Sequence, residues 1–151
     1  MLTFSDVHNI LKIKDDVVGT LTSIKLTIEP TSTSTDGQYY LTLLGETVTT
    51  VANPSNASNK RFYVRNSKAA NALYLAKALS SCPSIAANYY VYATEDGTCN
   101  IVAKIIGLVI TDTANMVQTN LPQSQFTVSL TNGTSTSKLL GSRVVANIMT
   151  G

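Results

Sequence analysis

The residues that could carry out catalysis or hold a metal are few in this sequence and widely separated. The single histidine is His8, and the two cysteines, Cys82 and Cys99, form no C-x-x-C pair. A structural zinc site needs four ligands, which one His and two Cys cannot supply. A catalytic triad would have to use His8, and the chain has no G-x-S-x-G turn, P-loop or G-x-G-x-x-G motif. The sequence therefore predicts no catalytic residue, no metal site, no cofactor and no enzymatic activity.

The remaining titratable side chains give no acid–base pair. Acidic residues are scattered, and the two adjacent pairs, Asp15–Asp16 and Glu95–Asp96, would point to opposite faces of a strand. We expect Cys82 and Cys99 to be buried, inert thiols, and a disulfide between them is the open alternative.

One local concentration of charge is present, and it is basic. Lys60, Arg61, Arg65 and Lys68 surround Phe62 and Tyr63, a pattern that could follow a phosphate backbone while aromatic rings stack on bases. Two interpretations are open. The four side chains are either a solvated strand end that pairs with carboxylates, which we favour, or part of a lumen through which DNA passes without sequence readout.

The composition is unusual for a domain of 151 residues. Charged residues make up 13% of the chain and the formal net charge is +2, whereas about 25% charged residues is usual. The balance of charge argues against a dedicated nucleic-acid binder. No apolar run approaches the length of a membrane span, and the start lacks a basic then apolar signal peptide, so we expect no membrane partner. A sparsely charged, Thr-rich surface is poorly protected against strand pairing, which favours a subunit of an assembly.

Alternating and turn-bounded segments predict a mainly β, α+β fold. Residues 18–29 alternate strictly, with Ile24, Leu26 and Ile28 on one side. Further strands are expected at 38–44, 47–52, 60–65, 89–95, 98–106, 125–131 and 137–149, with 108–111 as a continuation and 113–124 as a loop. Asp96-Gly97 and Asn132-Gly133 are expected as hairpin turns, the first of type I′. The result would be an antiparallel sandwich or open barrel of about eight strands.

One principal helix is expected over residues 66–81. Asn66 would be its N-cap, and its buried stripe would consist of Ala69, Ala72, Leu73, Ala76 and Leu79. Pro83 would end it, and 84–88 would form a short extra turn. Residues 1–16 are expected to be an N-terminal arm or short helix, with 17–151 as a single β-rich domain.

The segment 66–107 resembles a module of tailed-bacteriophage virion proteins. In that module a helix of the pattern N-A-x-x-L-A-x-A-L is followed by P-x-I-A-A-x-Y-x-V and a β-hairpin. Here the two patterns read Asn71-Ala-Leu-Tyr-Leu-Ala-Lys-Ala-Leu79 and Pro83-Ser-Ile-Ala-Ala-Asn-Tyr-Tyr-Val91. The Thr-, Ser- and Asn-rich composition is also similar to neck, ring and tail components of crAss-like phages. No long tube-forming hairpin is evident, which favours a neck ring over a tail tube.

The resemblance implies a non-enzymatic subunit of a phage particle, assembled in the host cytoplasm. It would form a homo-oligomeric ring in the neck, connector or tail, contacting portal, neck or tail proteins and, in its lumen, passing DNA. Neighbours would share sheet edges or exchange arms. The expected contacts are Phe4 and Val7, the loop residues Thr31, Asp36 and Gly37, and the C-terminal residues Val144, Val145 and Met149. The alternative is an extracellular β-sandwich adhesion or carbohydrate-binding module, for which the seven tyrosines would supply contact surface although tryptophan is absent.

Overall fold

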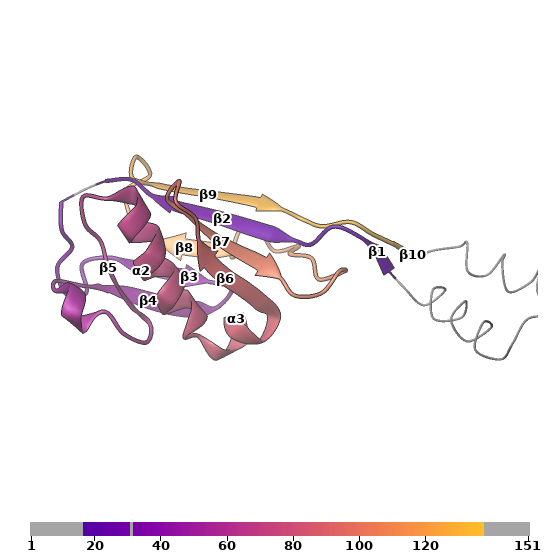
Figure 1. Cartoon of the computed structure of the whole chain (residues 1–151), viewed down its shortest axis with the longest axis horizontal. Helices are drawn as coiled ribbons and strands as arrows, with labels where there is room; N and C mark the ends of the chain where they lie inside the picture. Colours follow the sequence, from indigo (N-terminus) through magenta and orange to yellow (C-terminus); the bar gives the residue numbers. More distant parts are fainter. Residues whose placement is uncertain (1–16, 31, 138–151) are drawn as a thin grey trace, which may run out of the picture.

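Two four-stranded β-sheets lie one over the other and form the body of the protein (Figure 1). The computed structural model describes residues 17–30 and 32–137. The first sheet has the order β6-β7-β2-β9 and the second has the order β5-β4-β3-β8. This is the expected β-rich sandwich of about eight strands, and it is not a closed barrel. The bounds are β2 Ser23–Ile28, β3 Tyr40–Leu43, β4 Glu46–Val51, β5 Arg61–Tyr63, β6 Tyr89–Ala93, β7 Thr98–Ala103, β8 Val117–Thr119 and β9 Phe126–Thr131.

The first sheet is antiparallel throughout, and β2 lies between β7 and β9. The predicted alternation along β2 is confirmed, because Ile24, Leu26 and Ile28 are fully buried against the opposite sheet and the helix. In the second sheet, β4 pairs parallel with β5, and the other pairs are antiparallel. A short 3-10 helix, η1 (Pro54–Asn56), lies within the connection that makes this parallel pairing possible.

The principal helix, α2 (Lys68–Ser80), lies along one side of the sandwich (Figure 1). It contacts β5 at the edge of the second sheet as well as β6, β7 and β2 of the first. Its N-cap is Ser67 and not Asn66, because the Ser67 hydroxyl accepts the Ala70 N–H at 3.3 Å. The expected stripe is wrong at Ala69, which is exposed, and at Leu73, which is 50% exposed, while Leu75 is fully buried. The helix ends at Ser80, and a separate short helix, α3 (Pro83–Asn88), begins at Pro83 where the extra turn was expected.

A single buried amide, that of Asn71, joins α2 to both sheets. Its Oδ1 accepts the backbone N–H of Arg65, just after β5, at 2.7 Å, and its Nδ2 donates to the carbonyl of Ile28, the last residue of β2, at 3.2 Å. The side chain is fully buried. The Asn71 side chain therefore supplies a hydrogen-bond partner to one backbone N–H and one backbone C=O that lie at the ends of strands, where the sheet supplies none.

A two-stranded ribbon extends the first sheet beyond the body of the sandwich (Figure 1). It consists of β1 (Val17–Gly19) and β10 (Ser135–Ser137), paired antiparallel. The expected single strand over 18–29 is therefore divided into β1 and β2. The buried Thr22 lies in the break, where its hydroxyl accepts the Gly133 N–H at 3.0 Å and donates to the Leu108 carbonyl at 2.5 Å.

The expected hairpin at Asn132-Gly133 is wrong. The chain runs on from β9 to β10, and the partners of both strands come from the other end of the sequence. The Asn132 side chain instead bonds to both the N–H and the C=O of Ile110, each at 2.9 Å. Gly133 lies so close to Thr20 that an added Cβ would come within 2.0 Å of its carbonyl oxygen. Glycine is therefore used here for a close backbone approach and not for a turn.

Three other turn and strand predictions need correction. At Asp96-Gly97 only Gly97 has a positive φ, so the β6–β7 hairpin has a three-residue loop and not a type I′ turn. A two-residue turn with positive φ at both positions occurs instead at Leu44-Gly45, between β3 and β4. The expected loop over 113–124 contains β8, whereas 108–111 does not continue β7, which ends at Ala103.

Replacement of Asn71 tests whether this amide holds the helix to the two sheets. Asn71→Ala leaves the Arg65 N–H without this partner and the Ile28 carbonyl without its buried donor, and we expect the free energy of unfolding to fall by about 2 kcal/mol. Urea denaturation measures the change. The matched control is Asn88→Ala, which removes an exposed amide that bonds only to the Ser84 carbonyl, and its cost should stay within about 0.5 kcal/mol. Equal effects of the two substitutions would contradict the assignment.

Candidate functional site

The basic residues that cluster in the sequence are drawn apart by the fold. Lys60 pairs with Glu46 at 3.4 Å and Lys68 pairs with Glu29 at 3.3 Å. Lys68 begins α2, whereas the Lys60 N–H donates to the Ser81 hydroxyl at the other end of that helix. A helix of this length spans roughly 20 Å. Lys60 and Lys68 are thus paired with carboxylates at opposite ends of α2. The role of the four basic residues in a DNA lumen stays a prediction.

Arg61 instead lies beside a cation that the sequence did not single out. Arg61 lines a surface hollow of about 400 Å³ together with Tyr74 and Lys77 of α2, and the segment around η1 forms its other side. The Tyr74 ring is held edge-on against Tyr63, with centroids 5.7 Å apart. The residues that line the hollow are Pro54, Ala57, Ser58, Asn59, Arg61, Tyr74 and Lys77, so it is basic and contains no carboxylate.

The loop that was expected to contact a neighbour is attached to its own sheet. Asp36 Oδ1 accepts the Ala52 N–H at 2.7 Å, and the Gly37 N–H donates to the Thr50 carbonyl at 2.9 Å. Ser34 is buried, and its hydroxyl donates to the Val51 carbonyl at 2.7 Å. These internal hydrogen bonds give Asp36 and Gly37 a role in the fold of the single chain. Their role in subunit contact stays a prediction.

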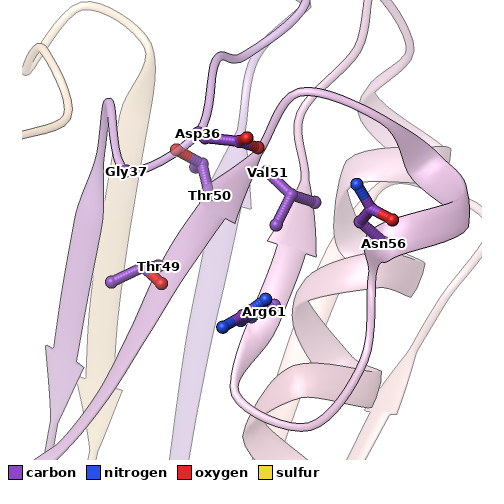
Figure 2. A pocket seen from close by; sticks show the side chains of 7 residues that line it. All are labelled: Asp36, Gly37, Thr49, Thr50, Val51, Asn56 and Arg61. Atoms are coloured by element: carbon purple, nitrogen blue, oxygen red, sulfur yellow. The ribbon is translucent and has the colours of Figure 1, made fainter.

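A pocket of about 310 Å³ opens beside this loop (Figure 2). Asp36 and Arg61 lie at different ends of it, and its other lining residues are Gly37, Thr49, Thr50, Val51 and Asn56. The one carboxylate already accepts a backbone N–H. The pocket offers hydroxyl and amide groups for binding, but no nucleophile next to a base.

The other predicted contact residues, Phe4, Val7, Thr31, Val144, Val145 and Met149, lie outside the described residues. Within 17–30 and 32–137, no group of three His, Cys, Asp or Glu side chains is placed to hold a metal ion. No helix in those ranges is long and apolar enough to cross a membrane.

The shifted titratable groups have structural causes. A hydrogen bond from the Ser84 hydroxyl, at 2.8 Å, is the main cause that lowers the pKa of Glu46, and Lys60 adds to it. Burial raises the pKa of the Cys82 thiol, and the Glu46 carboxylate raises it further. Burial alone raises the pKa of Cys99 to about 12. Both thiols are free and buried, as expected.

The surface that distinguishes the molecule is the pair of edges of the first sheet, formed by β6 and β9, neither of which pairs with a further strand within residues 17–30 and 32–137. Neither β6 (Tyr-Tyr-Val-Tyr-Ala) nor β9 (Phe-Thr-Val-Ser-Leu-Thr) contains a charged residue or a proline. The edges of the second sheet are three-residue strands, one of them carrying Arg61. Short strands and charged side chains are the usual protection of a sheet edge, and the first sheet has neither.

Apolar side chains are exposed along both of these edges. Val128 of β9 is 40% exposed, and with Phe126, Tyr40 and Leu121 it lines a groove of about 530 Å³ between β9 and β8. On β6, Tyr90 and Tyr92 are 58% and 48% exposed. Sequence reasoning located both strands but not their place at the edges. No local signal could have indicated it, because an uncharged strand is more typical of the interior of a sheet than of its edge.

Comparison with known proteins adds no relative: no family model, no curated protein and no solved structure matches this chain.

The buried thiols give a direct test of the packing around β7 and α3. A thiol with a raised pKa stays protonated at pH 8, and the thiolate is the reactive form. We expect Cys82 and Cys99 of the native protein to resist a thiol reagent at this pH, with less than a tenth modified in an hour. Both should react within minutes in denaturant, where their pKa values return to about 8.5. Rapid reaction of either thiol in the native state, followed by mass spectrometry, would contradict this burial.

Proposed function

We propose that this protein is a non-enzymatic structural subunit of a bacteriophage particle. It assembles into a homo-oligomeric ring in the neck, connector or tail and contacts other virion proteins there. The observation that carries the proposal is the pair of uncharged, unprotected edges on one sheet. A monomer with two such edges has a surface prone to strand pairing, whereas in an assembly each edge is covered by a neighbour.

The phage context comes from the sequence resemblance, and the elements of that module occur together in the fold. The helix pattern Asn71–Leu79 lies in α2, the P-x-I-A-A pattern lies in α3, and the hairpin is β6–β7. One of the two unprotected edges, β6, therefore belongs to the module that resembles virion proteins. DNA would pass through the ring without sequence-specific contact.

Assembly can be tested on the untagged full chain. We expect native mass spectrometry at micromolar concentration to give a homo-oligomer, because a single chain of 16.1 kDa leaves both edges in water. Val128→Lys places a charge at the β9 edge and should raise the concentration needed for assembly at least tenfold. Thr47→Lys adds the same charge to the exposed face of β4, in the second sheet, and should leave assembly unchanged.

A monomer at every concentration, both alone and mixed with the other proteins of its particle, would refute the proposal. Equal weakening by Val128→Lys and Thr47→Lys would show that added charge alone, and not the edge, controls association.

The second candidate is a carbohydrate-binding module, which the two exposed rings of Tyr90 and Tyr92 favour. They are two positions apart on β6 and therefore on one face, where aromatic rings can stack on sugars. Lys104 lies over the Tyr90 ring, with its Nζ 5.2 Å from the centroid. A glycan array separates the candidates: binding that is lost in Tyr92→Ala, from a protein that stays monomeric, would favour this function.

A further inference from the structure

We infer that the β9 edge of one copy pairs with the β6 edge of the next, antiparallel, so that the first sheet continues from subunit to subunit. The inference rests on the proposed self-assembly and names the surfaces and register that produce it. The occupant of the β9 edge is thus a second copy of this chain, with Val128 directly opposite Val91 of that copy.

The hydrogen-bonding phase of each edge follows from the ladder inside the sheet. In an antiparallel pair, residues alternate between bonding to their partner strand and pointing their N–H and C=O groups away from it. The Thr94 N–H bonds to Thr98 and the Lys104 N–H bonds to Asn88, which fixes the alternation along β6. Residues 90 and 92 therefore bond to β7, and residues 89, 91 and 93 point their backbone groups to the free edge.

The same reasoning applies at the opposite side of the sheet. The Glu29 N–H bonds to the Gln125 carbonyl, so residues 125, 127, 129 and 131 bond to β2. The free edge of β9 consequently presents residues 126, 128 and 130. Two of the N–H groups are used internally: that of Phe126 by Pro122 and that of Tyr89 by Ile85. Among the residues that the structure describes, nothing bonds to the edge-facing N–H and C=O groups of Val128, Leu130, Val91 and Ala93, which leaves them for a neighbour.

The two edges match in the direction of their side chains. Tyr89, Val91 and Ala93 pack toward the core from β6, and Phe126 and Leu130 do so from β9. Val128 shares their side, because successive residues of a strand alternate. Residues opposite each other in a ladder point to the same face. When the two edges pair, the core-facing, apolar side of the sheet in one copy is continuous with the core-facing side in the next. The half-exposed Val128 then contacts Val91 of the next copy.

The strand directions match as well. The sheet has four strands that alternate in direction, so its two edge strands, β6 and β9, run opposite ways. Copies related by rotation about a common axis keep the same orientation, and β9 of one then lies antiparallel to β6 of the next. Both edges are used in every copy, and such a head-to-tail contact closes into a ring when the rotation allows it.

The register that aligns all five residues of β6 places residues 126–130 opposite residues 93–89. Thr127 then faces Tyr92 and Ser129 faces Tyr90, on the outer face of the joined sheet. A β-branched residue such as Thr127 opposite an aromatic ring is a favourable cross-strand pair. The exposed Tyr90 and Tyr92 are covered at their edge in the assembly, which gives them a role independent of sugar binding.

Disulfide cross-linking of the full chain tests this register. Thr127 and Tyr92 would form a non-hydrogen-bonded pair, with Cα atoms about 4.5 Å apart, within the range for a disulfide. Within one chain they lie on opposite edges of the sheet, about 14 Å apart, at three strand spacings. A disulfide between the two introduced residues of the double variant Thr127→Cys/Tyr92→Cys therefore joins two copies, and the native Cys82 and Cys99 are buried. We expect a ladder of covalent multimers on mild oxidation.

The controls separate the inference from its alternatives. The mixed single variants Thr127→Cys and Tyr92→Cys should give only dimers that contain one of each, and each single variant alone should give none. Ser129→Cys/Tyr92→Cys, shifted by two residues, should cross-link at least tenfold less. Dimers from Thr127→Cys alone would indicate two-fold β9–β9 pairing and overturn the inference, as would a ladder only from the shifted pair.

A proline substitution tests the backbone contact separately. Val128→Pro removes an N–H that points to the free edge and bonds to nothing inside the sheet, a position at which edge strands accept proline. We expect a folded monomer by circular dichroism and native mass spectrometry, while Val128→Thr still assembles. If the protein assembles but neither the cross-link nor the proline effect appears, this inference fails and the proposed function stands. If no assembly forms, the proposed function fails.

Discussion

The hydrogen-bonding phase of β2 is the constraint on which the first sheet depends. Its odd-numbered residues bond to β9 and its even-numbered residues bond to β7. Ile24, Leu26 and Ile28 must face the core, so the phase is fixed by burial and cannot slip by one residue without exposing all three. The hydrogen-bonding phase of β2 determines the phase of β7 and β9, which pair with it, and through β7 the phase of β6. The backbone groups left free at β6 and β9 are thus determined at the centre of the sheet.

Polar side chains complete the fold where strands end. Ser34, Asn71 and Asn132 each bond to backbone groups that no strand supplies with a partner. Thr22 does the same between β2 and the ribbon. This use explains part of the composition, because a chain with few charged residues and many small polar ones can bury those side chains without burying charge. Thr, Ser and Asn residues are therefore used inside the fold as well as on its surface.

The sequence predicted elements whose signal is local and missed those whose partners are distant. The alternation at Ile24–Ile28 and the helix over α2 depend on neighbouring residues and were recognised correctly. Asn132-Gly133 has the composition of a turn, but its conformation is decided by Thr20 and Ile110, far away in the sequence. Leu73 and Leu75 lie on nearly opposite faces of α2, and the placement of the helix against the two sheets decides that Leu75 is buried and Leu73 exposed.

The candidate site was less predictable than the fold. Lys60, Arg61, Arg65 and Lys68 are neighbours in the sequence, yet Lys60 and Lys68 lie at opposite ends of α2. Glu46 and Glu29, from other parts of the sequence, pair with these two. The edges β6 and β9 were visible only as uncharged strands. Which strands lie at an edge is a property of strand order, and no local pattern encodes it.

The proposed edge-to-edge assembly depends on the even number of strands in the first sheet. Loss or gain of one edge strand would make the two margins run the same way, and a neighbour placed by rotation would then meet a parallel partner with a different bonding pattern. Loss or gain of a hairpin keeps the margins opposed. Under the proposed edge-to-edge assembly, an insertion of two strands at this sheet would preserve the contact between neighbours, whereas an insertion of one strand would not.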